Sequence, residues 1–169
     1  MIDASKRGFT LIELLVTLAV AAILVTVAVP NFQRFVMNNR MASQANDLIT
    51  AINIARSEAV KRAVNVTVCA SSNGTSCTGT WNQGWIVQDA SGNRLRVQQA
   101  LGGSSTLTGG TDVATQVAFT STGRTTIATT ATTASTTLTL CPPSPAQVQG
   151  RAIQIERTGR TRVSSVACP

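Results

Sequence analysis

The feature that most constrains this chain is an apolar stretch of 21 residues, Phe9–Val29, with one charged side chain, Glu13. As an α-helix this stretch is about 31 Å long, enough to cross the hydrocarbon core of a bilayer. Pro30 follows directly, and because proline lacks a backbone N–H we expect a kink or local unwinding there. A carboxylate inside a membrane helix is costly, so Glu13 is a functional candidate.

The residues before the apolar stretch predict its orientation. Lys6 and Arg7 lie on its N-terminal side, which favours a cytoplasmic N-terminus and export of the remainder. An ordinary secretory signal has an apolar region of only about 7–15 residues. The greater length here, and the acid near its start, argue against that reading.

The sequence KRGFTLIELLVTLAVAAIL, from Lys6 onward and closed by Pro30, resembles the class III leader and N-terminal helix of type IV pilins and type II secretion pseudopilins. The resemblance implies that prepilin peptidase cleaves between Gly8 and Phe9 and that the new N-terminal Phe9 is N-methylated. It also implies that Glu13 meets the amine of a neighbouring subunit and sets the register of a filament, a use to which buried ion pairs are suited. The alternative is that Glu13 is tolerated near the membrane interface by snorkelling.

After Pro30 the pattern predicts an amphipathic helix to about residue 64. Leu48, Ile52, Ala55 and Ala59 are spaced by four, three and four residues and therefore share one face. Short β-type runs follow, and the Gly pairs at 102–103 and 109–110 are expected to bracket a flexible loop. The candidate strands are 64–70, 84–89, 94–101, 116–122, 136–141, 151–156 and 160–166.

These patterns and the resemblance imply an α+β fold of the pilin type, with a long N-terminal helix packed on a C-terminal antiparallel β-sheet domain. The expected organisation is a cleaved leader at 1–8, the pilin helix at 9–64 and a β-rich globular domain at 65–169. Residues 9–29 form the expected transmembrane part of the helix.

Four cysteines, Cys69, Cys77, Cys141 and Cys168, fall in the part expected to be exported. An even number there indicates two disulfides, with three possible connectivities. We favour Cys69–Cys77, which closes a short polar loop, and Cys141–Cys168, which pins the C-terminus. No metal or other cofactor is expected, because the chain has no His and no C-x2-C pair.

The charge balance favours a polyanionic partner. The net charge is +7, and seven arginines but only two acids follow residue 90. A basic field of this size suits nucleic acid, anionic lipid or acidic polysaccharide. The alternative is that the net charge only keeps the domain soluble. We do not expect an enzyme, because the chain has no His or Tyr, its acids are dispersed and no phosphate-binding glycine loop is present.

The final predicted hairpin admits two registers around its turn. A two-residue loop, Thr158–Gly159, would put Arg162 on the same face as the apolar Ile153 and Ile155. A three-residue loop, 157–159, with a left-handed Gly159 and a bulge, places the arginines on the solvent face instead. We choose the second register because it buries the apolar residues, and it adds Val163 to the core face. Exposed guanidinium groups bind phosphate oxygens in a bidentate manner.

The β-rich part resembles the minor pilins and pseudopilins typified by the type II secretion H component, FimU and FimT. The resemblance rests on RSEAVKR at 56–62, FTSTGR at 119–124 and GRAIQIERTGRTR at 150–162. The element GRTR, Gly159–Arg162, looks like the G-R-x-R element of FimT, a minor pilin implicated in DNA binding during natural transformation. By that resemblance Arg157, Arg160 and Arg162, with Gly159 between them, map onto DNA-contacting positions.

The expected function is therefore that of a type IV minor pilin, closest to FimT, that binds double-stranded DNA through its phosphates for DNA uptake. Its expected partners are other pilins, prepilin peptidase and, before assembly, the inner membrane, with the C-terminal domain in the periplasm. After assembly it is expected at the pilus or cell surface. The alternative is a structural minor pilin or type II secretion pseudopilin that primes or caps a filament without binding DNA.

Overall fold

A computed structural model describes residues 8–127, 136–144 and 148–168 of the chain. It divides the chain into two compact units, one up to Val36 and one from Met37 onward. One long helix, α1 (Leu11–Arg62), contributes to both units. Lys6, Arg7 and the rest of the expected leader before Gly8 lie outside the described residues.

In the N-terminal unit α1 begins where the sequence supplies a cap. Thr10 Oγ1 accepts a hydrogen bond from the Glu13 backbone N–H at 3.3 Å, as expected for a Thr-x-x-Glu helix start. The helix continues without a break through Pro30, so the alternative of local unwinding there is wrong, whereas the kink stays a prediction. The Asn31 side chain donates to Val27 O at 2.9 Å in this turn.

The N-terminal unit has no buried residue among those that the structure describes, Gly8 to Val36. Its exposed side chains are mostly large and apolar, and Leu11 and Ile23 are 76% and 65% exposed. Within the described residues, α1 is the helix that is long and apolar enough to cross a membrane. An unpartnered apolar helix of this kind needs lipid or other apolar helices around it.

The part of α1 in the C-terminal unit has one buried face. The four residues whose spacing predicted this face are all fully or almost fully buried, which confirms the prediction. Alternation of alanines with larger residues lets the helix approach the sheets closely while still filling the core. The buried residues are Met41, Ala45, Leu48, Ala51, Ile52, Ala55 and Ala59.

The described strands form two four-stranded antiparallel sheets, which sequence patterns alone did not separate. The first has the order β3-β2-β1-β5 and the second β4-β6-β7-β8. The strands are β1 (Val66–Ala70), β2 (Trp85–Asp89), β3 (Arg94–Gln98), β4 (Thr106–Gly109), β5 (Gln116–Phe119), β6 (Thr137–Cys141), β7 (Gly150–Ile155) and β8 (Thr161–Val166).

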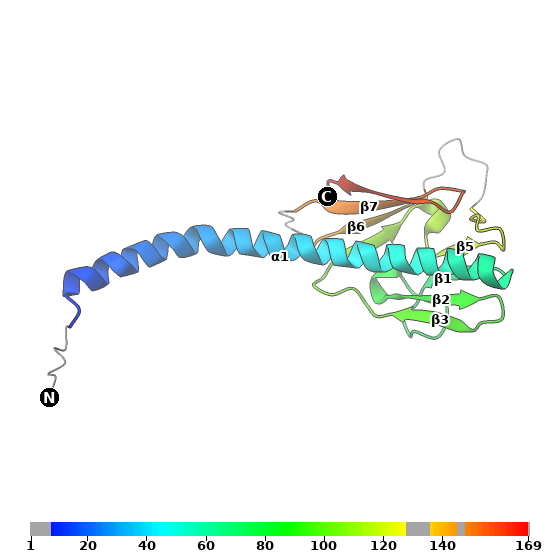
Figure 1. The fold of residues 1–169 in the computed structure, drawn as a ribbon, viewed down its shortest axis with the longest axis horizontal. Helices are drawn as coiled ribbons and strands as arrows, with labels where there is room; N and C mark the ends of the chain where they lie inside the picture. Colours follow the sequence, from blue (N-terminus) through cyan, green and yellow to red (C-terminus); the bar gives the residue numbers. More distant parts are fainter. Residues whose placement is uncertain (1–7, 128–135, 145–147, 169) are drawn as a thin grey trace, which may run out of the picture. The chain divides into compact units, whose positions relative to one another are not determined.

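One hydrophobic core joins α1 to both sheets. Figure 1 shows the C-terminal part of α1 running in nearly the same direction as the strands, with β2 and β3 on one side of it in this view and β6 and β7 on the other. Trp85 and Phe119 of the first sheet and Leu138 and Ile153 of the second are fully buried in the same cluster as the helix residues. The helix thus connects two sheets that share no strand.

Strand β4 corrects one expectation. The glycine-bracketed region was expected to be a flexible loop, yet Thr106–Gly109 pairs with β6, with Leu107 opposite Leu140. Leu107 is 4% exposed. A four-residue segment with one apolar side chain carries almost no local signal, so its state is decided by pairing with a distant strand.

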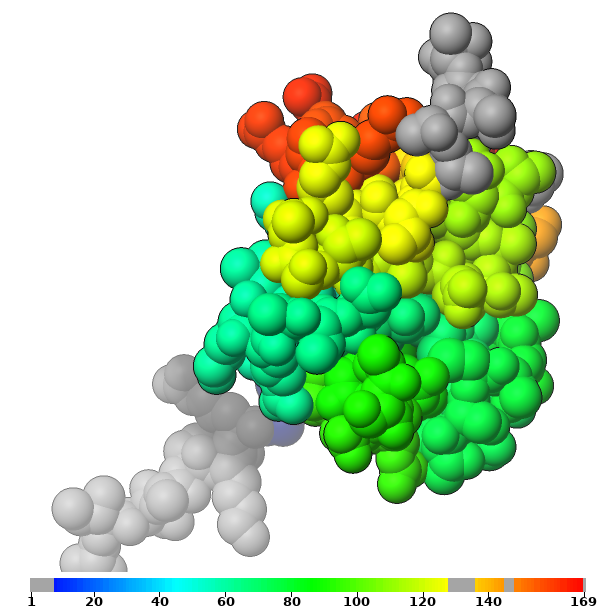
Figure 2. Space-filling view, turned by 90° about the vertical axis from the view of Figure 1, so that its right-hand side faces the viewer, coloured from blue at the N-terminus to red at the C-terminus, as the bar shows by residue number. Residues whose placement is uncertain are grey.

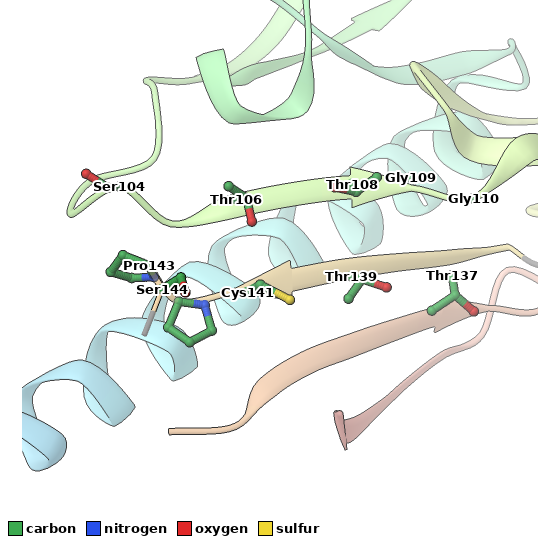
Figure 3. A pocket seen from close by; sticks show the side chains of 11 residues that line it. Ser104, Thr106, Thr108, Gly109, Gly110, Thr137, Thr139, Cys141, Pro143 and Ser144 are labelled. Atoms are coloured by element: carbon green, nitrogen blue, oxygen red, sulfur yellow. The ribbon is translucent and has the colours of Figure 1, made fainter. Parts of the chain in front are cut away.

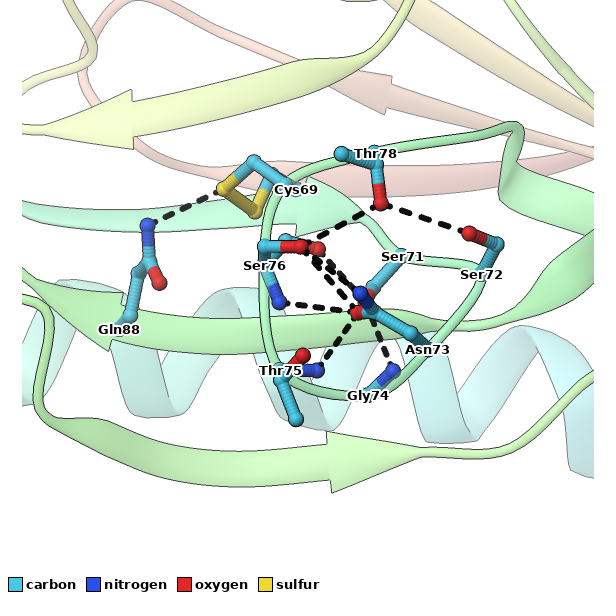
Figure 4. The surroundings of a disulfide bond; sticks show 10 residues. Cys69, Ser71, Ser72, Asn73, Gly74, Thr75, Ser76, Thr78 and Gln88 are labelled. Atoms are coloured by element: carbon cyan, nitrogen blue, oxygen red, sulfur yellow. Dashed lines mark hydrogen bonds between the residues drawn. A yellow bond between two sulfur atoms is a disulfide. The ribbon is translucent and has the colours of Figure 1, made fainter.

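Both disulfides favoured from the sequence are present, Cys69–Cys77 and Cys141–Cys168. The loop closed by the first is held by a network of polar side chains (Figure 4). Asn73 Oδ1 accepts the backbone N–H groups of Thr75 and Ser76 at 2.9 and 3.0 Å. Side chain to backbone bonds of this kind fix a turn without apolar burial.

The C-terminal end of α1 is tied to the β2–β3 hairpin by charge. Arg62 Nε lies 2.5 Å from Glu58 Oε2, and Arg62 Nη1 lies 3.9 Å from Asp89 Oδ2. The hydrogen bond from the Asn93 side chain is the largest effect on the pKa of Asp89, and it lowers that pKa. Backbone hydrogen bonds from Asn93 and Ser91 and the charge of Arg62 lower it further, whereas desolvation opposes them.

A depressed carboxyl pKa predicts a pH-dependent stability. The stabilisation from ionised Asp89 is present above the pKa that aspartate has in the unfolded chain, about 3.9, and is lost as the pH falls through the lower folded-state value. An Asp89→Asn variant should therefore be less stable than the wild type at pH 7, and the difference should be smaller at pH 2. Urea unfolding at both pH values measures this; an equal difference at both would contradict it.

Candidate functional site

The end of the last hairpin has the predicted register. Ile155 of β7 pairs with Thr161 of β8. Beyond this pair, the Glu156 backbone N–H donates to Arg160 O, and the Gly159 N–H donates to Glu156 O, both at 2.8 Å. Gly159 has a φ of +76°, a left-handed conformation that glycine adopts without strain. The predicted three-residue loop with a left-handed glycine is confirmed.

This register exposes the three arginines of the hairpin. Arg157, Arg160 and Arg162 are exposed, whereas Ile153 and Ile155, which face the other way, are fully buried. The sequence-predicted residues of this group therefore lie together at one hairpin end. Guanidinium groups held on a short, hydrogen-bonded turn can bind oxyanions from solvent.

Val163 lies on the predicted face of the hairpin but is not buried in the core. Val163 pairs with the fully buried Ile153 but is itself 47% exposed. β8 is the edge strand of its sheet, and none of its six residues is buried. The core therefore ends at β7. Strand alternation predicted the face of Val163, but it could not predict how far the core extends beneath that face.

A second turn, Thr120–Arg124, repeats the hydrogen-bond pattern of the first. The Thr120 N–H donates to Arg124 O, and the Gly123 N–H donates to Thr120 O, both at 2.8 Å. Gly123 has a φ of +74°. Each turn contains the triplet Thr-Gly-Arg, at 122–124 and 158–160. The two turns thus have the same sequence signal, the same backbone shape and an exposed arginine directly after the glycine.

The two turns are in direct contact over the end of α1. The Thr125 N–H donates to Arg157 O at 3.0 Å, and Arg56 Nε of α1 donates to Gly123 O at 3.2 Å. A methyl group on Gly159 would lie 2.5 Å from Gly123 O and 3.0 Å from Arg56 Cδ. Figure 2 shows this end of the molecule, with the yellow segment near residue 122 between the blue-green helix end and the red C-terminal strands.

Arg124 is the residue of this site that the sequence analysis did not assign. Its segment, 119–124, is part of the family resemblance, but no role followed for Arg124. Nothing in the local sequence places residue 124 beside residue 160. The signal that could have found it is the repeated Thr-Gly-Arg triplet. We call Arg124, Arg157, Arg160 and Arg162 the arginine surface.

One acidic side chain belongs to the same hairpin end. Glu156 Oε1 lies 2.7 Å from Arg162 Nε, and the two side chains are 34% and 63% exposed. Glu156 Oε2 also accepts a hydrogen bond from Thr158 Oγ1 at 3.5 Å. The four arginines and this carboxylate sum to a formal charge of +3, which gives the surface an anion-attracting field.

The residues expected to serve processing and assembly lie at or just before the start of α1, far in sequence from the arginine surface. They are Gly8, Phe9 and Glu13. All three are exposed. Glu13 lies in the first helical turn, where its negative charge also complements the helix dipole. The structure holds no neighbouring subunit, so the intersubunit role of Glu13 stays a prediction.

A second surface feature is an open groove of about 700 Å³ along β4 and β6. Figure 3 shows threonine side chains of both strands facing it, among them Thr106, Thr108 and Thr139. The described residues that line the groove carry hydroxyl, glycine, proline and disulfide groups and no titratable side chain, so they supply no general acid or base. Among the described residues, no cluster of His, Cys, Asp and Glu could hold a metal ion.

The apolar N-terminal helix, its capped start and the two-sheet C-terminal unit define a pilin-like protein. The chain belongs to the family of the type II transport protein GspH, whose family model matches residues 44–159. The prokaryotic N-terminal methylation motif matches residues 3–29. Together these two matches place the chain among GspH-type proteins that carry an N-terminal methylation motif.

Two similar solved structures are crystal structures of the type IV minor pilin FimU from Pseudomonas aeruginosa (strain PAO1), in space groups P21 and P65. The first is 23% identical, covers 77% of this chain and 92% of that chain, and has a TM-score of 0.57. The second is also 23% identical, covers 73% of this chain and 91% of that chain, and has a TM-score of 0.55. At this identity the likeness shows the pilin fold. No curated protein matches the chain significantly.

Because the two turns are in contact, replacing Gly159 by alanine should lower the free energy of unfolding more than the same change at Gly92, another left-handed glycine. Gly159→Ala forces a methyl group against Gly123 O, whereas Gly92, with a φ of +82°, has nothing within 4 Å of the added methyl group. Gly92→Ala should cost about 1 kcal/mol of unfolding free energy from backbone strain alone. Gly159→Ala should cost at least about 2–3 kcal/mol because steric overlap adds to that strain. Urea unfolding compares them; equal costs would contradict the contact.

Proposed function

We propose that this minor pilin binds double-stranded DNA through the arginine surface and serves DNA uptake in natural transformation. The observation that carries the proposal is the joining of two identical Thr-Gly-Arg turns, which gathers four exposed arginines from distant parts of the sequence. The last hairpin alone contributes three of these arginines, and the contact between the turns adds Arg124. A rigid cluster loses less side-chain and backbone freedom on binding than arginines on independent loops would.

The chemistry of the surface fits phosphate better than base edges. Guanidinium groups on short turns can contact the phosphate backbone of a duplex from outside, without entering a groove. Binding should therefore be independent of sequence and strongly dependent on salt. With three to four phosphates neutralised, the slope of log K against log salt should be about −2.7 to −3.6.

Binding by one subunit should be weak, and assembly can compensate for this. Membership in a pilin family implies association with other pilins in a filament. Several copies, or several pilins that each bind DNA, would raise the effective affinity without any new contact. We propose that the subunit waits in the inner membrane with its β-rich part in the periplasm, that prepilin peptidase cleaves it after Gly8, and that it then enters a pilus at the cell surface.

The DNA-binding proposal predicts the behaviour of arginine variants. The unit from Met37 onward contains every buried core residue that the structure describes, so a Met37–Pro169 fragment should fold and retard duplex DNA at low salt. Arg160→Ala with Arg162→Ala should weaken retardation strongly and make the salt slope of the remaining binding shallower by about 0.9 to 1.8. Electrophoretic mobility shift at several salt concentrations measures both effects.

The matched control removes two arginines elsewhere. Arg94→Ala with Arg96→Ala lowers the net charge equally, but these residues lie on β3, at the opposite edge of the first sheet from β5. This control should retain most of the retardation. If neither the wild type nor the control retards DNA at low salt, or if both double variants behave alike, the proposal is wrong.

A second candidate function is priming or capping of a filament without DNA. The observation in its favour is the exposed apolar half of α1, which suits packing among other pilin helices whatever the C-terminal unit does. Under this alternative, deletion of the protein abolishes piliation or secretion and the Arg160→Ala, Arg162→Ala double variant restores it fully. Under DNA uptake, the same variant restores pili but not transformation.

The assembly role proposed for Glu13 is tested separately from DNA binding. Glu13→Gln removes the negative charge that would meet the amine of a neighbouring subunit but keeps a similar shape and polarity. The variant should be cleaved normally yet be reduced at least about tenfold in sheared pili, because a register contact is lost. Immunoblots of membrane and pilus fractions measure this. Wild-type incorporation of the variant would contradict the role.

A further inference from the structure

Glu156 is the acidic side chain within the arginine surface, and its position is unusual for a residue beside a proposed phosphate site. Its Oε1 lies 2.7 Å from Arg162 Nε, so one edge of that guanidinium is already occupied by a carboxylate. Thr158 Oγ1 donates to the other carboxylate oxygen. Both oxygens of Glu156 therefore bind groups of its own hairpin, at the place where a phosphate would bind.

The carboxylate is not required to build the turn. The loop is closed by two backbone hydrogen bonds, from the Glu156 N–H to Arg160 O and from the Gly159 N–H to Glu156 O. These bonds do not involve the side chain at position 156. An ion pair between side chains as exposed as these contributes little to folding stability. The effect of Glu156 should therefore be found mainly in binding.

We propose that Glu156 is an internal competitor for phosphate at Arg162 and sets the affinity of the arginine surface; this inference rests on the proposed DNA binding. In the free protein Glu156 neutralises Arg162, so the surface offers three arginines that have no acidic partner among the described residues. A phosphate that binds Arg162 must displace or share the carboxylate and is also repelled by it. The competitor keeps binding weak and readily reversible, as a filament that must hand DNA on requires.

The competition has a distinct signature in the salt dependence. A surface with three uncompensated arginines should give a slope of about −2.7, and release of Arg162 should bring the slope to about −3.6. Glu156→Gln removes the charge but keeps an amide oxygen that can still accept from Arg162 Nε. It should bind duplex DNA about two- to fivefold more tightly at low salt, with a slope steeper by about 0.9.

The experiment uses the full chain in detergent and a short fluorescent DNA duplex, with anisotropy recorded over a range of salt concentrations. Wild type, Glu156→Gln, Arg162→Ala and the Glu156→Gln, Arg162→Ala double variant are compared. Glu58→Gln is the matched control, because Glu58 also pairs with an arginine, Arg62, but on the helix end beside Asp89. The control raises the net charge equally, so it reports the effect of overall charge alone.

We expect Glu156→Gln to bind DNA more tightly and with a steeper salt slope than the wild type. Glu58→Gln should change both quantities clearly less. When Arg162 is already alanine, Glu156→Gln should have a much reduced effect. If the wild type binds and Glu156→Gln binds equally or more weakly, Glu156 orients Arg162 or has no role, and the inference is overturned. If Glu58→Gln matches Glu156→Gln, only overall charge acts and the inference is also overturned. Absence of binding by the wild type at low salt overturns the proposed function itself.

Discussion

Burial of one face of α1 is the constraint on which the C-terminal unit depends. Residues from Met41 to Ala59 form the buried stripe, and strands of both sheets pack against it in one cluster. The two sheets share no strand, so the helix face is what gives them a common core. Because apolar burial is the dominant favourable term in folding, this shared core fixes the two sheets against each other.

The proposed binding surface is a consequence of that arrangement. One turn follows β5 of the first sheet and the other joins β7 to β8 of the second, so the two sheets must be fixed relative to each other before the turns can meet. Arg56 of the same helix then bonds to Gly123 O, directly beside Gly159. The two turns need glycine for their left-handed backbone, and Gly159 also needs it for the close approach to Gly123.

The sequence predicted those features for which local pattern and burial agree. The helix face followed from a 3.6-residue period, and the register of the last hairpin followed from the need to bury Ile153 and Ile155. Strand β4 was missed because pairing with a distant strand decides its state. Alternation placed Val163 on the correct face, but it could not predict that the core does not extend below that face. Arg124 was missed because its position beside the hairpin depends on tertiary packing alone.

If the two turns form one DNA-binding surface, both should respond to DNA at the same time. Amide chemical-shift perturbation of the isotopically labelled Met37–Pro169 unit, titrated with a short DNA duplex at low salt, follows both turns in one experiment. We predict that the Gly123 and Gly159 amides and their neighbours shift together, with one shared dissociation constant, and return as salt is added. Shifts confined to one turn, or centred on β3 or on the groove along β4 and β6, would contradict a shared surface.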